Sequence, residues 1–418
     1  MLLAAAMAPD QDAFVTGLAE HNLPLAGRCA AQPERKVSDE AIDRLRWALV
    51  DRSRDPAADL RARIAAGEAL GELGDPRFKR CKSAEGVAYL LPPMVRVPGG
   101  RYWIGSDEGS YPDVLPRQEV EVETFWIGQF PVTNAEYACF IAARGYEDPR
   151  WWVGEAAQRW WRGEGTDDAS RARDRQWRQR FLQEPELLDR MKAEGTVTAE
   201  LHKEWTKIAR LDDAAFGHLL SQKYKDGPKR RPDRWNRLTP ADGNRPVIGA
   251  SWFEAAAYAA WLAATADKVF QVTHEVEWEL AATGPNGWRY PFGEDFRPEA
   301  CNNASLHLGR PAPVGSFSQG DAPCGASDLC GNVLEWTNQY PGVFPIALGN
   351  MPALDGNAVK KHSGADPLVQ IKRNREWQAA GADLRANLRR SFLAAHRAID
   401  TGFRLTTPIT TLKEEPRV

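Results

Sequence analysis

Residues 244–263 read NRPVIGASWFEAAAYAAWLA, and this stretch gives the clearest prediction of local structure in the chain. Large apolar side chains recur among closely spaced alanines, a pattern that predicts an apolar helix rather than a strand. We expect the large residues of this helix to face the core: Trp252, Tyr258, Trp261 and Leu262.

The segments after this helix become progressively richer in loops. VFQVTHEVEWELAATG at 269–284 predicts a short strand followed by a second helix. Proline and glycine then interrupt residues 284–357 so often that few long elements fit. GFRL at 402–405 predicts a closing strand near the end of the chain.

The segments before the helix change from helical to strand-like patterning. MVRVPGGRYWIGS at 94–106 alternates apolar and polar residues around two glycines, which predicts a hairpin. VEVETFWIGQFPV at 120–132 predicts another strand region, and Thr133 is placed to cap the helix NAEYACFIAARG.

The N-terminal part predicts a separate helical module. Residues 1–37 give little periodic signal, so we expect them to be poorly ordered. Residues 38–90 predict two helices, with Ser38 as the N-cap of the first. They resemble one unit of a helical repeat, and one unit cannot bury its own apolar face. We therefore expect this module to dock on the domain that follows.

Residues 147–240 differ from both neighbours, because arginine, glutamate, glutamine and tryptophan alternate there in helical patterns. Arginines interleaved with aromatic rings occur on nucleic-acid surfaces. Acidic residues offset these arginines, so we interpret the segment as a solvated helical insertion.

The composition narrows the possible partners. The 418 residues include 54 Lys and Arg against 57 Asp and Glu, a net charge of −3 that disfavours nucleic acid and anionic membranes as partners. No apolar run reaches the ~18–20 residues that span a bilayer. Six cysteines without a framework spacing favour a reducing compartment, so we expect a cytoplasmic protein. A disulfide or redox pair of Cys324 and Cys330 is one alternative.

Seven segments in this order resemble the formylglycine-generating-enzyme family, also called the sulfatase-modifying-factor domain. The resemblance implies an α+β, loop-rich fold of the C-type-lectin type over residues 94–410, interrupted by the insertion at 147–240. The segments are VRVPGGRYWIGS (95–106), PVTNAEYACF (131–140), residues 244–263, EVEWELAATG (275–284), YPFG (290–293), GNVLEW (331–336) and GFRL (402–405).

The resemblance also locates the chemistry of the family, which oxidises thiols at two copper-binding cysteines. Arg373 and Trp377 match the motif before these cysteines, and the cysteine positions are then occupied by Ala379 and Leu384. Neither side chain binds a soft metal ion or exchanges a thiol. The histidines also lack the spacing of an iron site on a helix. We therefore expect neither copper nor iron, and we expect that the chain is not an enzyme.

The same resemblance also predicts a calcium site. The GNVxEW turn of the family binds calcium through hard oxygen ligands, which this ion prefers. The matching side chains here are Asn332 and Glu335, with the carbonyls of Gly331 and Val333 nearby. The alternative is that both side chains only hydrogen-bond within their own turn.

These observations predict a non-catalytic module that binds a protein or peptide, with its recognition surface in residues 373–402. Similar spacing occurs in variable proteins of diversity-generating retroelements, so a variable protein or a sensor is possible. The alternative is an enzyme with a cysteine-independent site, for example around His274, Glu275 and Glu277. The oligomeric state is not predicted. The residues expected to contact the ligand are Trp377, Gln378, Leu388, Arg390, Phe392, Leu393, His396, Ile399 and Asp400.

Overall fold

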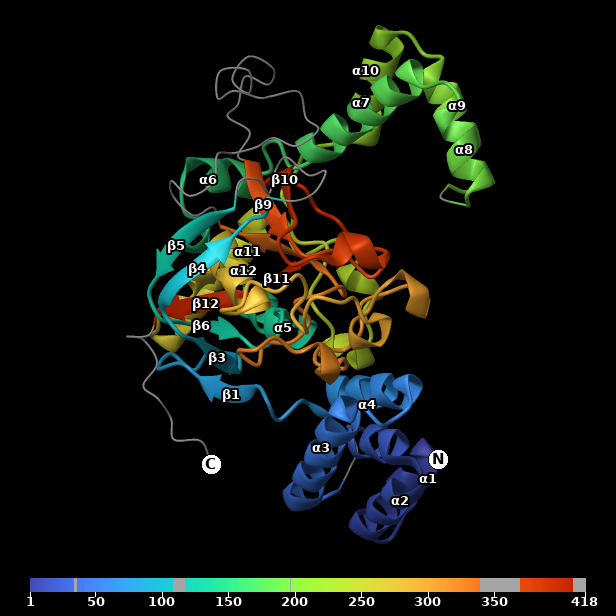
Figure 1. Ribbon diagram of the computed structural model, residues 1–418. Coiled ribbons are helices and arrows are strands. Elements are labelled where there is room, and N and C mark those ends of the chain that lie inside the picture. Colours follow the sequence, from blue (N-terminus) through green and yellow to red (C-terminus); the bar gives the residue numbers. More distant parts are fainter. Residues whose placement is uncertain (34–35, 108–116, 196, 339–368, 409–418) are drawn as a thin grey trace.

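The computed structural model describes residues 1–33, 36–107, 117–195, 197–338 and 369–408 (Figure 1). Short strands and helices are joined by long loops, which confirms the predicted α+β class. Two four-stranded sheets organise the body of the molecule. In spatial order, the first contains β3 (Met94–Val97), β6 (Phe125–Gly128), β12 (Leu405–Pro408) and β7 (Gln271–Val272), and the second β10 (Arg389–Leu393), β9 (Val369–Arg373), β8 (Leu334–Thr337) and β11 (Thr401–Phe403).

The predicted hairpin at 94–106 is wrong. β3 pairs with β6, whereas β4 (Gly100–Ile104) pairs with β5 (Gln118–Val122). A Cβ atom at Gly99 would lie 2.5 Å from the backbone nitrogen of Thr124. The glycine therefore lets two chain segments pass closely instead of reversing the chain between β3 and β4. A further small pair joins β1 (Lys79–Lys82) to β2 (Ala88–Leu91).

Three helices pack beside the sheets around an aromatic core. α11 (Trp252–Ala266) buries Tyr258, Trp261 and Leu262 as predicted, while Trp252 stays half-buried. α5 (Asn134–Ala142) begins at Thr133 with a complete capping box, and α12 (Glu275–Thr283) follows β7. Rings from distant segments meet in this core, and the Tyr258 ring lies 5.6 Å from that of Phe403. Such ring pairs stabilise a core that has little regular secondary structure.

The expectation of a poorly ordered N-terminal segment is also wrong. Residues 1–37 contain α1 (Leu2–Met7) and α2 (Gln11–Ala30), which pack with α3 (Asp39–Arg54) and α4 (Leu60–Leu73). The α2 interface combines small residues, such as Gly27 against Leu49 and a buried Ala26, with the larger Val15, Leu18 and Leu23. Asn22 has a non-helical conformation and Pro24 follows it within α2, so the helical period is interrupted and the pattern in the sequence was weak.

The four-helix module docks on the body through α4, as expected for a unit that cannot cover its own face. Arg63 donates to the Ser316 carbonyl at 2.8 Å, and Glu68 accepts a hydrogen bond from Arg310 at 2.8 Å. A Cβ atom at Gly71 would lie 2.6 Å from the Ala241 carbonyl oxygen, so glycine permits the close approach of helix and body.

The insertion divides into two parts. Trp152 and Trp160 stack at 5.4 Å and join the core of the body, with α6 (Glu155–Trp161) covering it. The rest projects as an arm with its own small core around Phe181 and Trp205 (Figure 1). The helices of this arm are α7 (Asp168–Gln183), α8 (Leu187–Ala193), α9 (Ala199–Ala209) and α10 (Asp213–Lys223).

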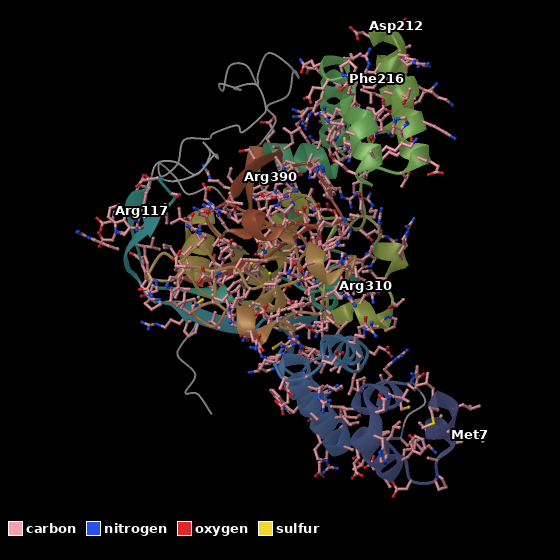
Figure 2. All side chains as sticks on the ribbon, turned by 45° about the vertical axis from the view of Figure 1, so that its right-hand side comes forward. Met7, Arg117, Asp212, Phe216, Arg310 and Arg390 are labelled. Carbon is pink, nitrogen blue, oxygen red and sulfur yellow. The ribbon has the colours of Figure 1, made fainter. Side chains whose placement is uncertain are left out.

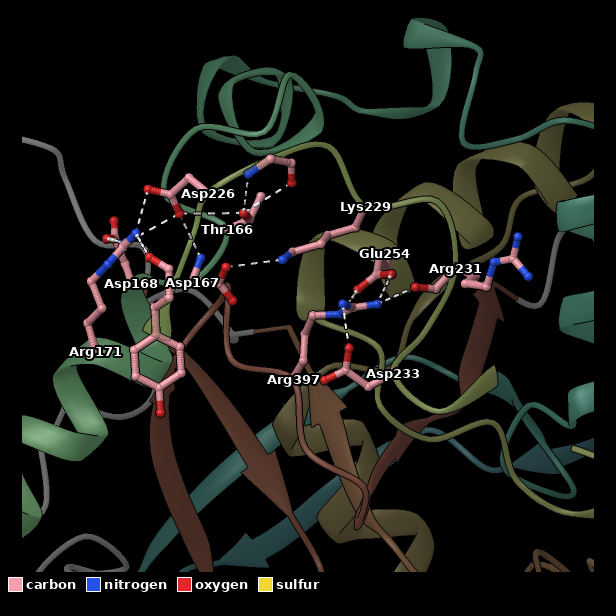
Figure 3. Close-up of polar contacts among 12 residues, drawn as sticks. Thr166, Asp167, Asp168, Arg171, Asp226, Lys229, Arg231, Asp233, Glu254 and Arg397 are labelled. Atoms are coloured by element: carbon pink, nitrogen blue, oxygen red, sulfur yellow. Dashed lines mark hydrogen bonds and ion pairs between the residues drawn. The ribbon is translucent and has the colours of Figure 1, made fainter. Parts of the chain in front are cut away.

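Polar contacts fix the base of the arm (Figure 3). Arg171 pairs with Asp226 at 2.9 Å, so the two ends of the arm lie side by side. Next to it, Arg397 binds Asp233 at 2.6 Å and Glu254 at 3.0 Å, linking the C-terminal segment to α11. Within the described part of the chain, no helix combines the length and apolarity needed to cross a membrane.

Candidate functional site

The β9–β10 hairpin has one face that anchors it to the body. Side chains alternate between the two faces of a sheet, so Arg373 and Arg389, which are paired across the ladder, point the same way. Arg373 reaches Glu279 at 2.9 Å, and Arg389 reaches Glu275 at 2.8 Å, both on α12. The charge-assisted hydrogen bonds of Arg389 satisfy both oxygens of Glu275 and hold the hairpin against this helix.

The opposite face carries Lys372 and Arg390, which are also directly paired across the ladder. Lys372 is fully buried although it is a lysine. Its Nζ donates to Thr401 Oγ1 and to His396 Nδ1, both at 2.9 Å. The same atom lies 4.2 Å from the centre of the Trp336 ring and 4.1 Å from that of Phe392. These rings and acceptors replace the water that a lysine normally keeps.

Burial changes the protonation of this pair. It lowers the pKa of Lys372 to about 7, although nearby Asp400 acts in the opposite direction. Burial, followed by the positive charges of Lys372 and Arg173, lowers the pKa of His396 to about 2. The imidazole is therefore neutral at pH 7 and accepts the hydrogen bond from the amine.

Further charges surround Arg390 on the same side of the hairpin. Partial burial, then nearby Arg375, lowers the pKa of Arg390, whereas Glu376, Asp400 and Asp383 raise it. Charged groups of both signs thus gather within interaction distance of one another. We refer to the following residues as the C-terminal cluster: Lys372, Arg375, Glu376, Asp383, Arg390, His396 and Asp400.

Unsatisfied polar atoms lie in the same segment. Gln370 Oε1, Trp377 Nε1 and Asn387 Oδ1 are buried and have no hydrogen-bond partner among the described residues. The Gln370 and Trp377 residues are only 7% and 5% exposed. Buried polar groups are normally satisfied because an unmade hydrogen bond costs about 1–3 kcal/mol. One indole donor and two amide acceptors therefore lack a partner among the described residues.

The structure places the nine predicted contact residues at different depths. Gln378 and Arg390 are exposed, whereas Trp377 and Leu388 are buried. The half-buried residues between these extremes are Phe392, Leu393, His396, Ile399 and Asp400. Of the nine, Arg390, His396 and Asp400 belong to the C-terminal cluster. Figure 2 shows Arg390 on the half of the body that faces the arm, far from Met7 of the N-terminal module.

The sequence prediction missed four members of this cluster: Lys372, Arg375, Glu376 and Asp383. A signal for Lys372 existed, because it stands between Ile371 and Arg373 in a strand whose neighbours are buried. A lysine in a buried strand is rare unless it is paired.

The positions of the family's cysteines lie in an apolar setting. Ala379 and Leu384 are both buried and pack with Tyr290 and Cys301.

The carboxylates near His274, which the alternative of an enzyme would use, make hydrogen bonds within the protein. Glu275 pairs with Arg389, and Glu277 accepts hydrogen bonds from the His274 backbone and from the Thr406 hydroxyl. Among the described residues, no three His, Cys, Asp or Glu side chains are grouped to hold a metal ion.

The predicted calcium ligands do not fit a calcium ion as they are placed. Arg404 donates to both carboxylate oxygens of Glu335, at 2.6 and 2.7 Å, and the Trp278 indole adds a third bond at 2.9 Å. Asn332 Oδ1 accepts from Asn302 Nδ2 at 3.1 Å and from the Ala312 backbone at 2.8 Å. A hard cation needs free, converging oxygens, and these are used by the protein.

The side-chain amide of Asn374 lies where the carbonyls of Gly331 and Val333 would otherwise converge on a cation. Asn374 Nδ2 donates to the carbonyls of Gly331 at 2.7 Å and Val333 at 3.0 Å, and lies 3.2 Å from that of Asp328. Asn374 has φ of +69°, a left-handed conformation that asparagine tolerates better than most residues. The four predicted ligands, Gly331, Asn332, Val333 and Glu335, are therefore explained by hydrogen bonding within the protein.

Comparison with known proteins agrees with the resemblance seen in the sequence. The family of sulfatase-modifying factor enzyme 1-like domains matches residues 82–409. Hercynine oxygenase from Mycolicibacterium smegmatis is 28% identical over 325 residues, which cover 74% of this chain and 60% of that protein. Inactive C-alpha-formylglycine-generating enzyme 2 from Bos taurus is 29% identical over 267 residues, covering 59% of this chain and 71% of that protein.

Among solved structures, PvdO from Pseudomonas aeruginosa aligns with a TM-score of 0.44 and 19% identity, covering 79% of this chain and 98% of its own. The chain spans 60% of the length of the hercynine oxygenase that it matches. Because the family match extends over most of its residues, this chain belongs to the family of sulfatase-modifying factor enzyme 1-like domains.

Proposed function

We propose that this protein is a non-catalytic binding module that recognises a protein or peptide segment through residues 373–402. The observation that carries the proposal is the coincidence of the C-terminal cluster with buried, unsatisfied polar atoms in the same segment. Recognition surfaces combine a few well-placed polar groups with aromatic area, and the half-buried Phe392 supplies the aromatic part next to Lys372.

The chemistry of the cluster favours a peptide over a simple ion. Arg375 and Arg390 suit a carboxylate, whereas Glu376 and Asp400 suit an amine or guanidinium group. The unsatisfied indole N–H of Trp377 and the amide oxygen of Asn387 match a backbone carbonyl and a backbone N–H. A peptide carries all four kinds of group within a few residues.

Two observations support a role without catalysis. The family's cysteine positions hold the buried, apolar Ala379 and Leu384, which have no redox or metal chemistry. The amine of Lys372 is fully buried between two rings, so it does not reach the surface as a nucleophile for a substrate would.

Selection from a displayed library of random peptides on the purified full chain tests the proposal. Selected peptides are then measured by calorimetry against the wild type, Arg390→Ala and the control Arg101→Ala, which removes an exposed arginine on β4. We expect Arg390→Ala to weaken binding by about tenfold or more, the effect of losing ~1.4 kcal/mol, and Arg101→Ala to leave it unchanged. Failure to enrich any peptide, or equal affinity for the three proteins, contradicts the proposal.

An enzyme with a cysteine-independent site is the second candidate, because one relative is named hercynine oxygenase. The test is incubation of the full chain with hercynine, a thiol, oxygen and iron(II), followed by mass spectrometry of the small molecules. The binding proposal expects no consumption of hercynine beyond that in a sample without protein. Turnover that depends on the chain would favour the enzyme.

A further inference from the structure

Two thiols meet beneath the segment that contains Ala379 and Leu384. Cys301 and Cys330 lie 29 positions apart in the sequence, yet both belong to one small buried cluster. Both are free, and each residue is only 2% exposed. Their neighbours are the rings of Tyr290, Phe292 and Phe296 and the side chains of Ala379 and Leu384.

The backbone explains why the thiols meet. Asn302 and Gly331 form a parallel bridge, and Asn332 N donates to Asn302 O at 2.9 Å. Cys301 and Cys330 each come one residue before this bridge. Neighbouring strands run about 4.8 Å apart and paired positions share a face, so both side chains point to the same side. This spacing falls within the Cα separations of about 4.4–6.8 Å that disulfides accept.

Glycine makes the close approach of the two segments possible. A Cβ atom at position 331 would lie 2.1 Å from the Asn302 carbonyl oxygen, and Gly331 has φ of +68°. Both facts exclude a larger residue there. The Asn302 amide also donates to Asn332 Oδ1 at 3.1 Å, which fixes the register that brings the cysteines together.

The third cysteine of this half of the chain is not part of the pair. Cys324 Sγ donates to the Ala281 carbonyl at 3.4 Å, in the core beside α12. Cys330 Sγ points instead toward the Leu384 carbonyl, at 3.6 Å, and the Cys301 sulfur accepts from Asn303 Nδ2 at 3.7 Å. Cys324 and Cys330, which the sequence offered as one alternative pair, thus contact different parts of the core.

We propose that Cys301 and Cys330 form a redox-active dithiol that a small peroxide converts to a disulfide. Hydrogen peroxide first oxidises one thiol to a sulfenic acid and releases water. The second sulfur then attacks the sulfenic sulfur, forms the S–S bond and releases a second water. The two sulfurs supply two electrons, both peroxide oxygens leave as water, and the two thiol protons leave with them.

Burial restricts this reaction to small oxidants. Burial, and then the adjacent Cys301, raises the pKa of the Cys330 thiol, which lowers its thiolate population. A peroxide is small enough to enter during local opening of the loops, whereas bulky alkylating reagents are excluded from the closed state. We therefore expect oxidation to stop at the disulfide, because the second thiol lies in the same buried cluster as the first.

The experiment oxidises the reduced, folded full chain with hydrogen peroxide, then alkylates it in denaturant and digests it. Mass spectrometry should find one peptide pair linked through Cys301 and Cys330, and an intact mass lower by two hydrogens. Cys324→Ser is the matched control and should retain the link, while Cys301→Ser and Cys330→Ser should lose it and accumulate oxygenated cysteine. Circular dichroism on each variant checks that it is folded.

A second measurement keeps the test independent of the variants. The oxidised wild type should melt several degrees above the reduced protein, because the bond closes a long loop of the unfolded chain. Dithiothreitol should reverse the shift. Recovery of Cys301 and Cys330 as free, alkylated thiols after oxidation, or a link through Cys324, overturns the proposal.

Discussion

Burying the amine of Lys372 costs stability in its charged form, although this residue belongs to the C-terminal cluster. Its amine lies between two rings and two acceptors, and burial lowers its pKa from 10.5 to about 7. The folded protein therefore binds fewer protons than the unfolded chain between pH 7 and about 10.5. Stability contributed through this residue rises with pH in that window and is lost as pH falls through 7.

Lys372→Met should remove this dependence. We expect the variant to be more stable than the wild type at pH 7, because a buried amine is replaced by an apolar chain of similar shape. The advantage should shrink by up to about 1.4 kcal/mol per unit as pH rises toward 9. Urea denaturation at pH 7 and pH 9 measures it, with Lys79→Met, an exposed lysine, as the control. An advantage of equal size at both pH values would show that Lys372 does not titrate in this window.

Asn374 shows how a side-chain amide can satisfy the carbonyls of a turn. Its amide collects carbonyl oxygens in the turn at 328–333, and Arg404 occupies the Glu335 carboxylate. We therefore expect neither calcium nor a chelator to move the melting temperature by more than about 1 °C, since only a ligand that binds the folded state shifts it. Differential scanning fluorimetry with calcium chloride and with EDTA makes the comparison. A rise of several degrees with calcium would mean that the turn rearranges around an ion.

At the scale of elements, buried arginine–carboxylate pairs hold the loop-rich body together. Glu275 on α12 is the shared partner of Arg389 and Arg373 on the hairpin. Glu275→Gln leaves the buried guanidinium of Arg389 with a neutral partner, whereas Arg373 keeps Glu279 at 2.9 Å. Breaking a buried ion pair typically costs ~3–5 kcal/mol. We expect a loss of this order in chemical denaturation. Glu121→Gln, an exposed partner of Arg101 at 3.9 Å, should change stability by less than about 0.5 kcal/mol.

Equal effects of these two substitutions would contradict the anchoring role of the α12 carboxylates. A selective effect of Glu275→Gln on peptide binding without loss of stability would also contradict it. We assign the ion pair of Glu275 and Arg389 to holding the hairpin against α12, and not to contacting a ligand.

Elements with local signals were predictable from the sequence. The capping box at Thr133 and the N-cap at Ser38 are made by neighbouring residues, so both helix starts are confirmed. Strand pairing depends on distant residues, and the predicted hairpin at 94–106 failed for this reason. The C-terminal segment was found through family spacing, but its division into a face anchored on α12 and a face that carries Lys372 and Arg390 needed the register of β9 with β10.

At the scale of the molecule, the described chain consists of three separately packed parts. The N-terminal module and the arm each have a core of their own, and the body holds the large aromatic core. The sequence indicated the three parts but not their boundaries. Trp152 and Trp160, counted with the insertion, belong to the body, because their rings pack on Tyr146 and Phe253.

The central claim, that the C-terminal segment is the recognition surface, is tested most directly by hydrogen–deuterium exchange of the full chain with and without a selected peptide. Binding slows exchange where backbone amides are covered or their opening is suppressed. The account predicts protection concentrated in residues 369–402. Protection confined to the arm at 168–223 or to the N-terminal module at 1–73, with 369–402 unchanged, would contradict it.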